Sequence, residues 1–407
     1  MVILPTTEPH GKRLRRPRGG ADPGIPALRL MPTLPCQRHR FEIPDEIAYF
    51  NCGYMSPLLR RVRETGERAI ARKSRPWELP PAYFFEVLHD ARTRFATLLG
   101  ATGEDIAVIP AVSYGMATAA RNTPMGPGRR VLMLDEEFPS TIYAWRERAA
   151  ETGAEAVLLP RPRDNDWTRL VLDAIDERTA AAALPRCHWT DGALLDLTAI
   201  AARLREVGAV LALDLTQTLG AMPFDLAAVR PDWVIVATYK WLLGPYSVGF
   251  MYVSPERQGG SPLEHAWMAR EGSEDFSQLV SYRDRFQPGA RRFDVGEPSN
   301  FGQLPMATAG LEQILEWGVA AIQETLSRTT SAIVAGAEPL GFSAVPRERR
   351  AGHYLGLRRA GGLPAGLAER LTAARVYASV RGDALRITPH LYNNGRDLGR
   401  LLEVLAG

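Results

Sequence analysis

The sequence predicts an α/β protein with a large domain, built on a mostly parallel seven-stranded sheet between helices, and a small C-terminal α+β domain. Two observations support this fold class. Between residues 107 and 254, short apolar segments alternate with helical segments, and strands separated by helices pair in parallel through right-handed crossovers. The short segments are apolar nearly throughout, which is typical of a sheet covered on both faces.

The elements follow in order from residue 41, where the composition becomes that of a globular protein. Helices are expected over 58–75 and 82–99, because the prolines between them cannot continue a helix. Strands are expected at 107–110, 131–134, 156–160, 181–184, 210–215, 233–240 and 249–254, with helices opening at Ser113 and near Ser140 and another over 197–207. Ligands bind at the carboxyl ends of such strands, so a site is expected there.

The C-terminal part has a different pattern. After an irregular, charged segment over 255–300, a long helical stretch over about 304–335 contains Gly310 and Gly318, which weaken it. It leads to a strand at 353–358, a helix at 365–374, strands at 376–380 and 384–388, and a helix at 394–405. We therefore predict a disordered basic tail (1–40), a large domain (41–300) and a small C-terminal domain (301–407), with 41–75 contributing to the small domain or to a dimer contact.

Composition and charge narrow the function. Residues 1–40 hold eight Lys and Arg against two acids, so the total charge of +3 leaves 3 − 6 = −3 for the rest; a mildly acidic body argues against nucleic-acid binding. No apolar run approaches the roughly 18 residues of a membrane span. The basic tail has no apolar segment after it, so it is not a secretory signal. It is a disordered tail, a contact arm, or an extension ahead of a start at Met31. Three cysteines do not form a disulfide framework, which favours the cytoplasm.

Two neighbouring strand ends predict the cofactor. Asp214 closes one apolar strand and Lys240 the next, and the chain has only three lysines, Lys12, Lys73 and Lys240. A lysine retained at a strand end indicates a need for its amine, because arginine cannot form a Schiff base. Pyridoxal phosphate (PLP) needs such an amine and a carboxylate that keeps its ring nitrogen protonated. The structural alternatives are a surface lysine after an edge strand and an aspartate that caps a loop.

Other side chains meet the remaining needs of PLP. Its phosphate needs a helix N-terminus, which Ser113 is expected to cap, and Phe138, just past a strand end, can stack on its ring. The candidate cofactor contacts are Ser113, Gly115, Phe138, Thr190, Gln217 and Tyr239. The alternatives are a capping serine of an ordinary helix, a core phenylalanine and a plain loop amide, and we expect His188 to be structural as readily as functional.

One arginine is a candidate for binding the carboxylate of a substrate. Arg386 lies in an otherwise apolar strand, and a buried guanidinium there suits a bidentate carboxylate clamp, with an internal ion pair as the alternative. Asn51 and Tyr54, in the turn that precedes Ser56 and Pro57, are further candidates for substrate contacts. We expect no metal site.

Taken together, these segments resemble the class V aminotransferase family of PLP enzymes, which has the fold type I architecture. The resemblance covers about residue 41 to the C-terminus and rests on AVSYGMATAA, DEEFPSTIYAW, HWTDGALLDL, LALDLTQTLGAMPFDL, ATYKWLLGPYSVGF and LRITPHLYN. It implies the following site residues: Lys240 as the internal aldimine lysine, Asp214 at the ring nitrogen, Gln217 at the ring oxygen, Ser113, Tyr114 and Tyr239 at the phosphate, Phe138 on the ring and Arg386 at the substrate carboxylate.

The resemblance also implies a homodimer with shared active sites. The stretch DVGEPSNF (294–301) is similar to the loop that completes the partner's phosphate site, so Ser299 and Asn300 are candidates. The pattern departs at Glu297, where many relatives carry threonine.

Two departures bear on the reaction. No cysteine follows Cys187, which argues against cysteine desulfurase chemistry, and Phe138 replaces the ring-stacking histidine of those enzymes. The chain is more similar to the kynureninase and isopenicillin N epimerase branches. We expect a lyase (β-elimination, for example C–S cleavage) or an aminotransferase, with an amino-acid epimerase or a decarboxylating enzyme as alternatives. A non-catalytic PLP-fold binding module is the alternative from another class. A nucleotide-binding α/β enzyme is disfavoured, because both phosphate-loop motifs are missing.

Overall fold

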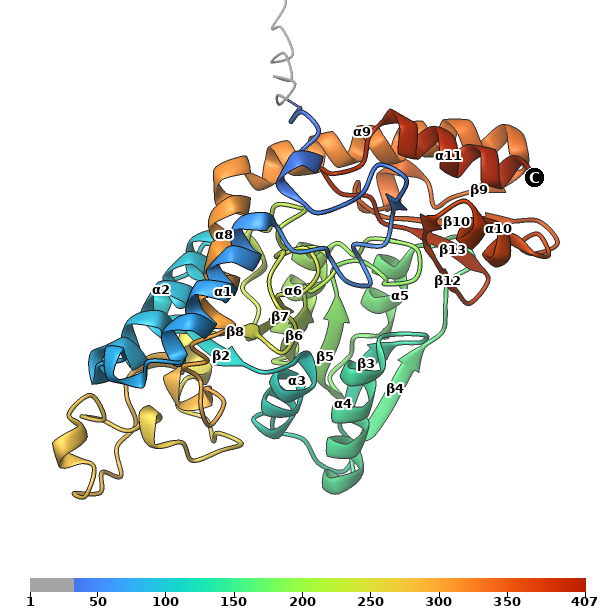
Figure 1. Ribbon diagram of the computed structural model, residues 1–407. Helices are drawn as coiled ribbons and strands as arrows, with labels where there is room; N and C mark the ends of the chain where they lie inside the picture. The colour runs from blue at the N-terminus through green and yellow to red at the C-terminus, as the bar shows by residue number, and fades with distance from the viewer. Residues whose placement is uncertain (1–32) are drawn as a thin grey trace, which may run out of the picture. The chain divides into compact units, whose positions relative to one another are not determined.

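A seven-stranded mixed sheet forms the centre of the structure, a computed structural model that describes residues 33–407 (Figure 1). Its strands lie in the order β2-β8-β7-β6-β5-β3-β4. Their bounds are β2 Ile106–Ile109, β3 Arg130–Leu134, β4 Glu155–Leu159, β5 Thr179–Pro185, β6 Val210–Asp214, β7 Trp233–Ala237 and β8 Gly249–Val253. Only β8 is antiparallel to its neighbours, β2 and β7, so the predicted mostly parallel sheet is confirmed.

Helices cover both faces of this sheet, as the apolar strands predicted. Alternate strand residues point to opposite faces, so Val131 and Ile235 pack beneath α3 and α4, whereas Leu132 and Val236 face α2, α6 and α8. The helix bounds are α1 Arg60–Lys73, α2 Pro81–Leu99, α3 Val112–Arg121, α4 Pro139–Thr152, α5 Trp167–Ala174, α6 Leu197–Glu206, α7 Leu226–Val229 and α8 Leu304–Trp317. Residues 255–293 contain short 3-10 helices at Pro255–Arg257, Trp267–Ala269, Phe276–Gln278 and Gly289–Phe293, with irregular segments between them.

The C-terminal part forms an antiparallel sheet of four strands in the order β12-β13-β10-β9. Leu385 and Ile387 of β13 pack with one group of helices, and Arg386 between them points to the opposite side. The elements are α9 Val319–Ala337, β9 Phe342–Ser343, β10 Leu355–Arg359, α10 Leu367–Ala373, β11 Val376–Tyr377, β12 Ser379–Arg381, β13 Ala384–Ile387 and α11 Gly395–Ala406.

The N-terminal segment joins this C-terminal part. Strand β1 (Ala48–Tyr49) pairs in parallel with β11, and Asn51 bridges Thr388. Residues 33–40, assigned to the tail from the sequence, also pack here: Gln37 N–H donates to Leu391 O at 2.7 Å, and Arg38 pairs with the buried Asp397 at 3.0 Å. Residues 1–32 lie outside the described part of the chain, and the division into a tail, a large domain and a small domain stays a prediction.

The structure corrects several local expectations. Helix α3 opens at Val112 with Ala111 as its N-cap, so Ser113 is inside the first turn and does not cap it. The long helix is two helices, α8 and α9, because Gly318 adopts a φ of 77° between them. Strand β7 ends at Ala237, so Lys240 lies in the turn that follows. Helices α5 and α7 and strand β9 were not predicted. Among the described residues, no helix is long and apolar enough to cross a membrane.

Candidate active site

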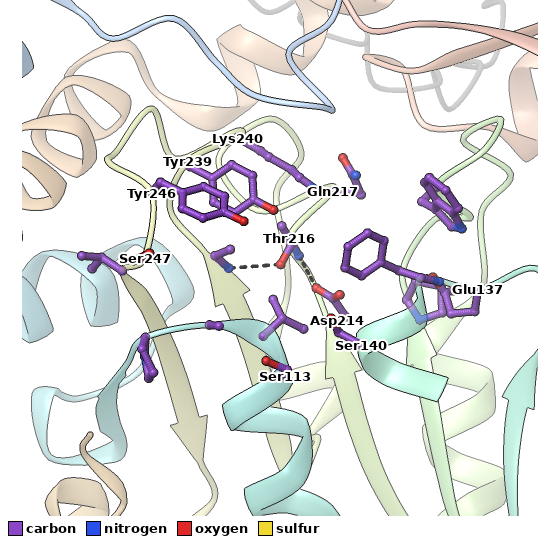
Figure 2. A pocket seen from close by; sticks show the side chains of 18 of the residues that line it. Ser113, Glu137, Ser140, Asp214, Thr216, Gln217, Tyr239, Lys240, Tyr246 and Ser247 are labelled. Atoms are coloured by element: carbon purple, nitrogen blue, oxygen red, sulfur yellow. Dashed lines mark hydrogen bonds between the residues drawn. The ribbon is translucent and has the colours of Figure 1, made fainter. Parts of the chain in front are cut away.

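A cavity opens at the carboxyl ends of β5, β6 and β7, next to the start of α3 (Figure 2). The predicted residues that line it are Ser113, Phe138, Asp214, Gln217, Tyr239 and Lys240; the sequence did not single out the further lining residues Glu137, Ser140, Trp189, Thr216, Tyr246 and Ser247. These side chains come from segments that lie between Pro110 and Val248 in the sequence. The strand ends meet at one edge because the central strands are parallel.

Lys240 presents a buried amine to this cavity. Only 6% of the residue is exposed, and its Nζ makes no hydrogen bond or ion pair with any described residue. Nζ lies 5.2 Å from the centre of the Phe138 ring and 5.4 Å from that of Tyr239. Burial lowers the pKa of Lys240 to about 8, although the charge of Asp214 acts in the opposite direction. The neutral, nucleophilic form is therefore far better populated than in an exposed lysine.

Asp214 is fixed at the end of β6 by the backbone that follows it. Thr216 N–H donates to Asp214 Oδ1 at 2.8 Å, and Thr216 Oγ1 accepts from Ala237 N–H at 3.1 Å, as the dashed lines in Figure 2 show. Desolvation raises the pKa of Asp214, and the bonds from Thr216 and the charge of Lys240 lower it. When one oxygen of a carboxylate is held in this way, the other oxygen can accept a hydrogen bond from the N–H of a protonated ring nitrogen.

The N-terminus of α3 supplies an anion-binding element. Its first turn contains no acidic residue, and no side chain that the structure describes caps it, so the first N–H groups are available for an anion. Ser113, in the second helical position, lines the cavity beside them. Gly115 serves another purpose than expected: a Cβ there would lie 2.8 Å from the side chain of Ile235, so this glycine lets α3 approach β7.

Gln217 is held in one orientation. Its Nε2 donates to Gly53 O at 3.0 Å, and its Oε1 accepts from Trp241 Nε1 at 3.1 Å. His353 Nε2 lies 2.7 Å from Gln217 O, and burial lowers the pKa of His353 to about 4, so this neutral ring donates to the carbonyl. The second N–H of the Gln217 amide is left for a ligand.

Phe138 and Trp189 form an aromatic corner of the cavity, with ring centres 5.7 Å apart in an edge-to-face arrangement. Glu137, next to Phe138, is buried; Phe138 N–H donates to its Oε1 at 2.6 Å, and its Oε2 has no partner among the described residues. Burial raises the pKa of Glu137 to about 8. Neither Glu137 nor Trp189 was predicted, because an acid in an acidic loop and a single tryptophan give no periodic signal.

The substrate candidates lie beyond this corner. Arg386 is 1% exposed and donates from Nη1 to Trp189 O at 3.4 Å. Asn51 accepts from Ser379 Oγ at 2.8 Å through its Oδ1, and Tyr54 is exposed. None of these three residues lines the cavity itself.

Five further predicted residues also lie away from the cavity. Tyr114 donates to Asp294 O at 3.4 Å, and Gly115 faces Ile235. Thr190 accepts a bond of 2.8 Å from Arg161, next to a His188 ring that stacks on Trp167, which fits the structural alternative for His188. Ser299 donates to Phe84 O at 2.6 Å, and Asn300 Oδ1 accepts from Gln303 N at the start of α8. The role of Ser299 and Asn300 toward a partner subunit stays a prediction.

The fold is that of PLP-dependent fold type I enzymes. A solved structure of a C-DES mutant with glycine covalently linked to its PLP cofactor superimposes with a TM-score of 0.80 at 19% identity, covering 91% of this chain and 98% of that one.

The family is shown by sequence. The class V aminotransferase family matches residues 69–369, so the chain belongs to it and is a PLP-dependent enzyme. Relatives include the uncharacterized aminotransferase YcbU of Bacillus subtilis, 26% identical over 78% of this chain and 82% of that protein. They also include the kynureninase of Burkholderia mallei, 25% identical over 73% of this chain and 72% of that protein. The predicted family, fold and cofactor are confirmed.

The cavity has the donor set that PLP requires. Among residues 33–407, it offers a buried amine that has no hydrogen-bond or ion-pair partner, a carboxylate with a free oxygen, an uncapped helix N-terminus and an aromatic ring. A charged amine buried without a ligand would be costly, which fits a lysine that binds a cofactor.

Proposed function

We propose that this chain is a lyase or an aminotransferase that acts at the Cα of an amino-acid substrate. The observation that carries the proposal is the amine of Lys240, which has no hydrogen-bond or ion-pair partner in the described part of the chain. It is buried in a cavity that Asp214 and Phe138 also line. When bound, PLP supplies an electron sink for negative charge at the substrate Cα. The kinship to an aminotransferase and to kynureninases supports both reaction types.

Each residue has a role in this proposal. The amine of Lys240 would hold the cofactor and would take the Cα proton of the substrate as a general base, for which a pKa of about 8 is well suited. Asp214 keeps the ring nitrogen protonated. Phe138 excludes water from one ring face and offers no acid or base there.

The phosphate of the cofactor and the carboxylate of the substrate bind to different residues in this proposal. The N-terminus of α3, with Ser113, receives the phosphate, and the hydroxyl of Tyr239 adds a donor. Arg386 receives the carboxylate, because its guanidinium is buried and pairs with no acid among residues 33–407.

The reaction type is decided by a panel of amino acids offered to the PLP-loaded enzyme with and without a keto-acid acceptor. Release of pyruvate or ammonia without an acceptor identifies a lyase, and strict dependence on the acceptor identifies an aminotransferase. The Lys240→Ala variant is the control and is expected to be inactive under both conditions. If the wild-type enzyme only inverts the Cα configuration, the proposal is wrong and epimerisation replaces it.

We further propose a homodimer with shared sites in the cytoplasm. Ser299 and Asn300 lie outside this chain's own cavity, as expected of residues that serve a partner. The nearby segment exposes Val280 at 83% and Tyr282 at 96%, and a second copy would cover these side chains. The three free cysteines fit a reducing compartment.

A further inference from the structure

The hairpin of β12 and β13 presents two arginines on one face. In this antiparallel pair Ser379 lies opposite Arg386, and Arg381 lies opposite Ala384. Residues two apart along a strand point to the same side, so Arg381 and Arg386 share a face as diagonal neighbours. Long side chains in this arrangement are within reach of each other.

Both guanidinium groups contact the same aromatic ring. The Cζ atoms of Arg381 and Arg386 each lie 5.7 Å from the centre of the Trp189 indole, so they are separated by no more than twice that distance. Trp189 lines the cavity that contains Lys240. The two positive charges therefore lie next to a wall of the cavity, although neither arginine lines it directly.

The acids near this hairpin are already paired with other arginines. Asp191 forms ion pairs with Arg161 at 2.7 Å and with Arg358 at 3.0 Å. Asp383 pairs with Arg358 at 2.9 Å.

Neither Arg381 nor Arg386 has a carboxylate partner among the residues that the structure describes, and Arg386 Nε has no hydrogen-bond partner there. Burial and the neighbouring Arg386 lower the pKa of Arg381. Two close like charges without acids are unfavourable in the free protein, and anionic groups of a ligand would relieve this.

We propose that Arg386 and Arg381 bind two different anionic groups, so that the substrate is an amino acid with an acidic side chain. Arg386, the more deeply buried of the two, takes the α-carboxylate. Arg381, at the turn of the hairpin and partly exposed, takes the side-chain carboxylate and acts as the specificity-determining residue. This inference rests on the proposed function of the Lys240 site.

The test measures amino-acid binding to the PLP-loaded enzyme by the change in the visible spectrum of the cofactor. The ligands are L-aspartate and L-asparagine, and L-glutamate and L-glutamine, which differ only in the side-chain charge. We expect at least one acid to bind ten times or more tighter than its amide. In Arg381→Gln the ratio of the affinity for the acid to the affinity for its amide should fall to about one, while the affinity for the amide is unchanged. Arg381→Lys should retain part of the preference for the acid.

Two further variants complete the design. Arg386→Gln should weaken binding of acids and amides alike, and Arg396→Gln, an exposed arginine on α11, should change neither. The inference is overturned if the wild type does not prefer the acids. It is also overturned if Arg381→Gln weakens acids and amides equally, because both arginines then hold a single carboxylate. A wild-type protein that takes up no PLP would instead refute the proposed function.

Discussion

Burial shifts the acid–base behaviour of Lys240 and Glu137 in opposite directions. Both side chains line the same cavity, and the pKa falls to about 8 for Lys240 and rises to about 8 for Glu137. The cause is the same, because desolvation disfavours the charged form of each group. At neutral pH Glu137 is therefore protonated and adds no negative charge near Asp214, which leaves that residue as the carboxylate available to the ring nitrogen.

Glu137→Gln is predicted to change how stability depends on pH. Between pH 4.5 and 8 the folded state keeps the Glu137 proton that the unfolded state releases, so the wild type loses stability as pH rises, by up to about 1.4 kcal/mol per pH unit. The variant lacks this loss. Urea unfolding of the PLP-free proteins at several pH values checks it through the difference in slope. If the free energy of unfolding depends on pH in the same way for the two proteins, Glu137 ionises normally.

At the residue scale, the sequence pointed to those site residues that directly follow an apolar segment. The sequence singled out Asp214 and Lys240 because each follows an apolar segment, and Lys240 also because lysine is rare in this chain. Thr190 does not line the cavity, and its hydroxyl accepts from Arg161, which lies in the loop after β4. Sequence spacing does not show this pairing. Trp189 was missed because its position depends on Glu136 O, which accepts from its Nε1 at 2.6 Å.

At the scale of elements, the site depends on how closely α3 approaches β7. The helix N-terminus reaches the cavity only because residue 115 has no side chain, with Ile235 and Ile109 packed against that position. The sequence located this helix within one residue, but a helix turns about 100° per residue. Ser113 therefore faces the cavity, and Tyr114 and Gly115 face elsewhere.

Gly115→Ala is predicted to destabilise the protein and to weaken PLP binding. The added Cβ would meet Ile235 Cγ1 and Cγ2 at 2.8 Å, and such overpacking costs about 1–3 kcal/mol and displaces the anion-binding turn. Urea unfolding and PLP titration of the PLP-free protein measure the two effects. Gly399→Ala, in α11 with open space around it, is the control and should be neutral or up to about 1 kcal/mol more stable. Equal behaviour of the two variants would contradict the packing role of Gly115.

At the scale of the whole molecule, the large sheet provides Lys240 and the small sheet provides Arg386. Trp189, between them, accepts bonds from Arg386 and from Tyr354 through its carbonyl. The seven-stranded sheet was predictable because each strand has a local signal. The pairing of β1 with β11 was not, because strands of two residues, far apart in the sequence, have no such signal.

The proposed dimer gives a prediction at this scale. The double change Val280→Asp and Tyr282→Asp should convert the protein from a dimer to a monomer, because it places charges on an apolar surface that a second copy would cover. Light scattering during gel filtration should give about twice 44.8 kDa for the wild type. Leu158→Asp, at the edge strand β4, should remain dimeric. A wild type of single-chain mass would exclude the dimer.

The central claim is that Lys240 carries the cofactor, and borohydride trapping followed by peptide mapping tests it most directly. Reduction fixes PLP to the lysine that holds it, and Lys12, Lys73 and Lys240 are the only lysines that can do so. We predict the added mass on the peptide that contains Lys240, and its loss in Lys240→Ala. Labelling of Lys73 or Lys12 in the wild type, or no labelling after incubation with PLP, would contradict the account.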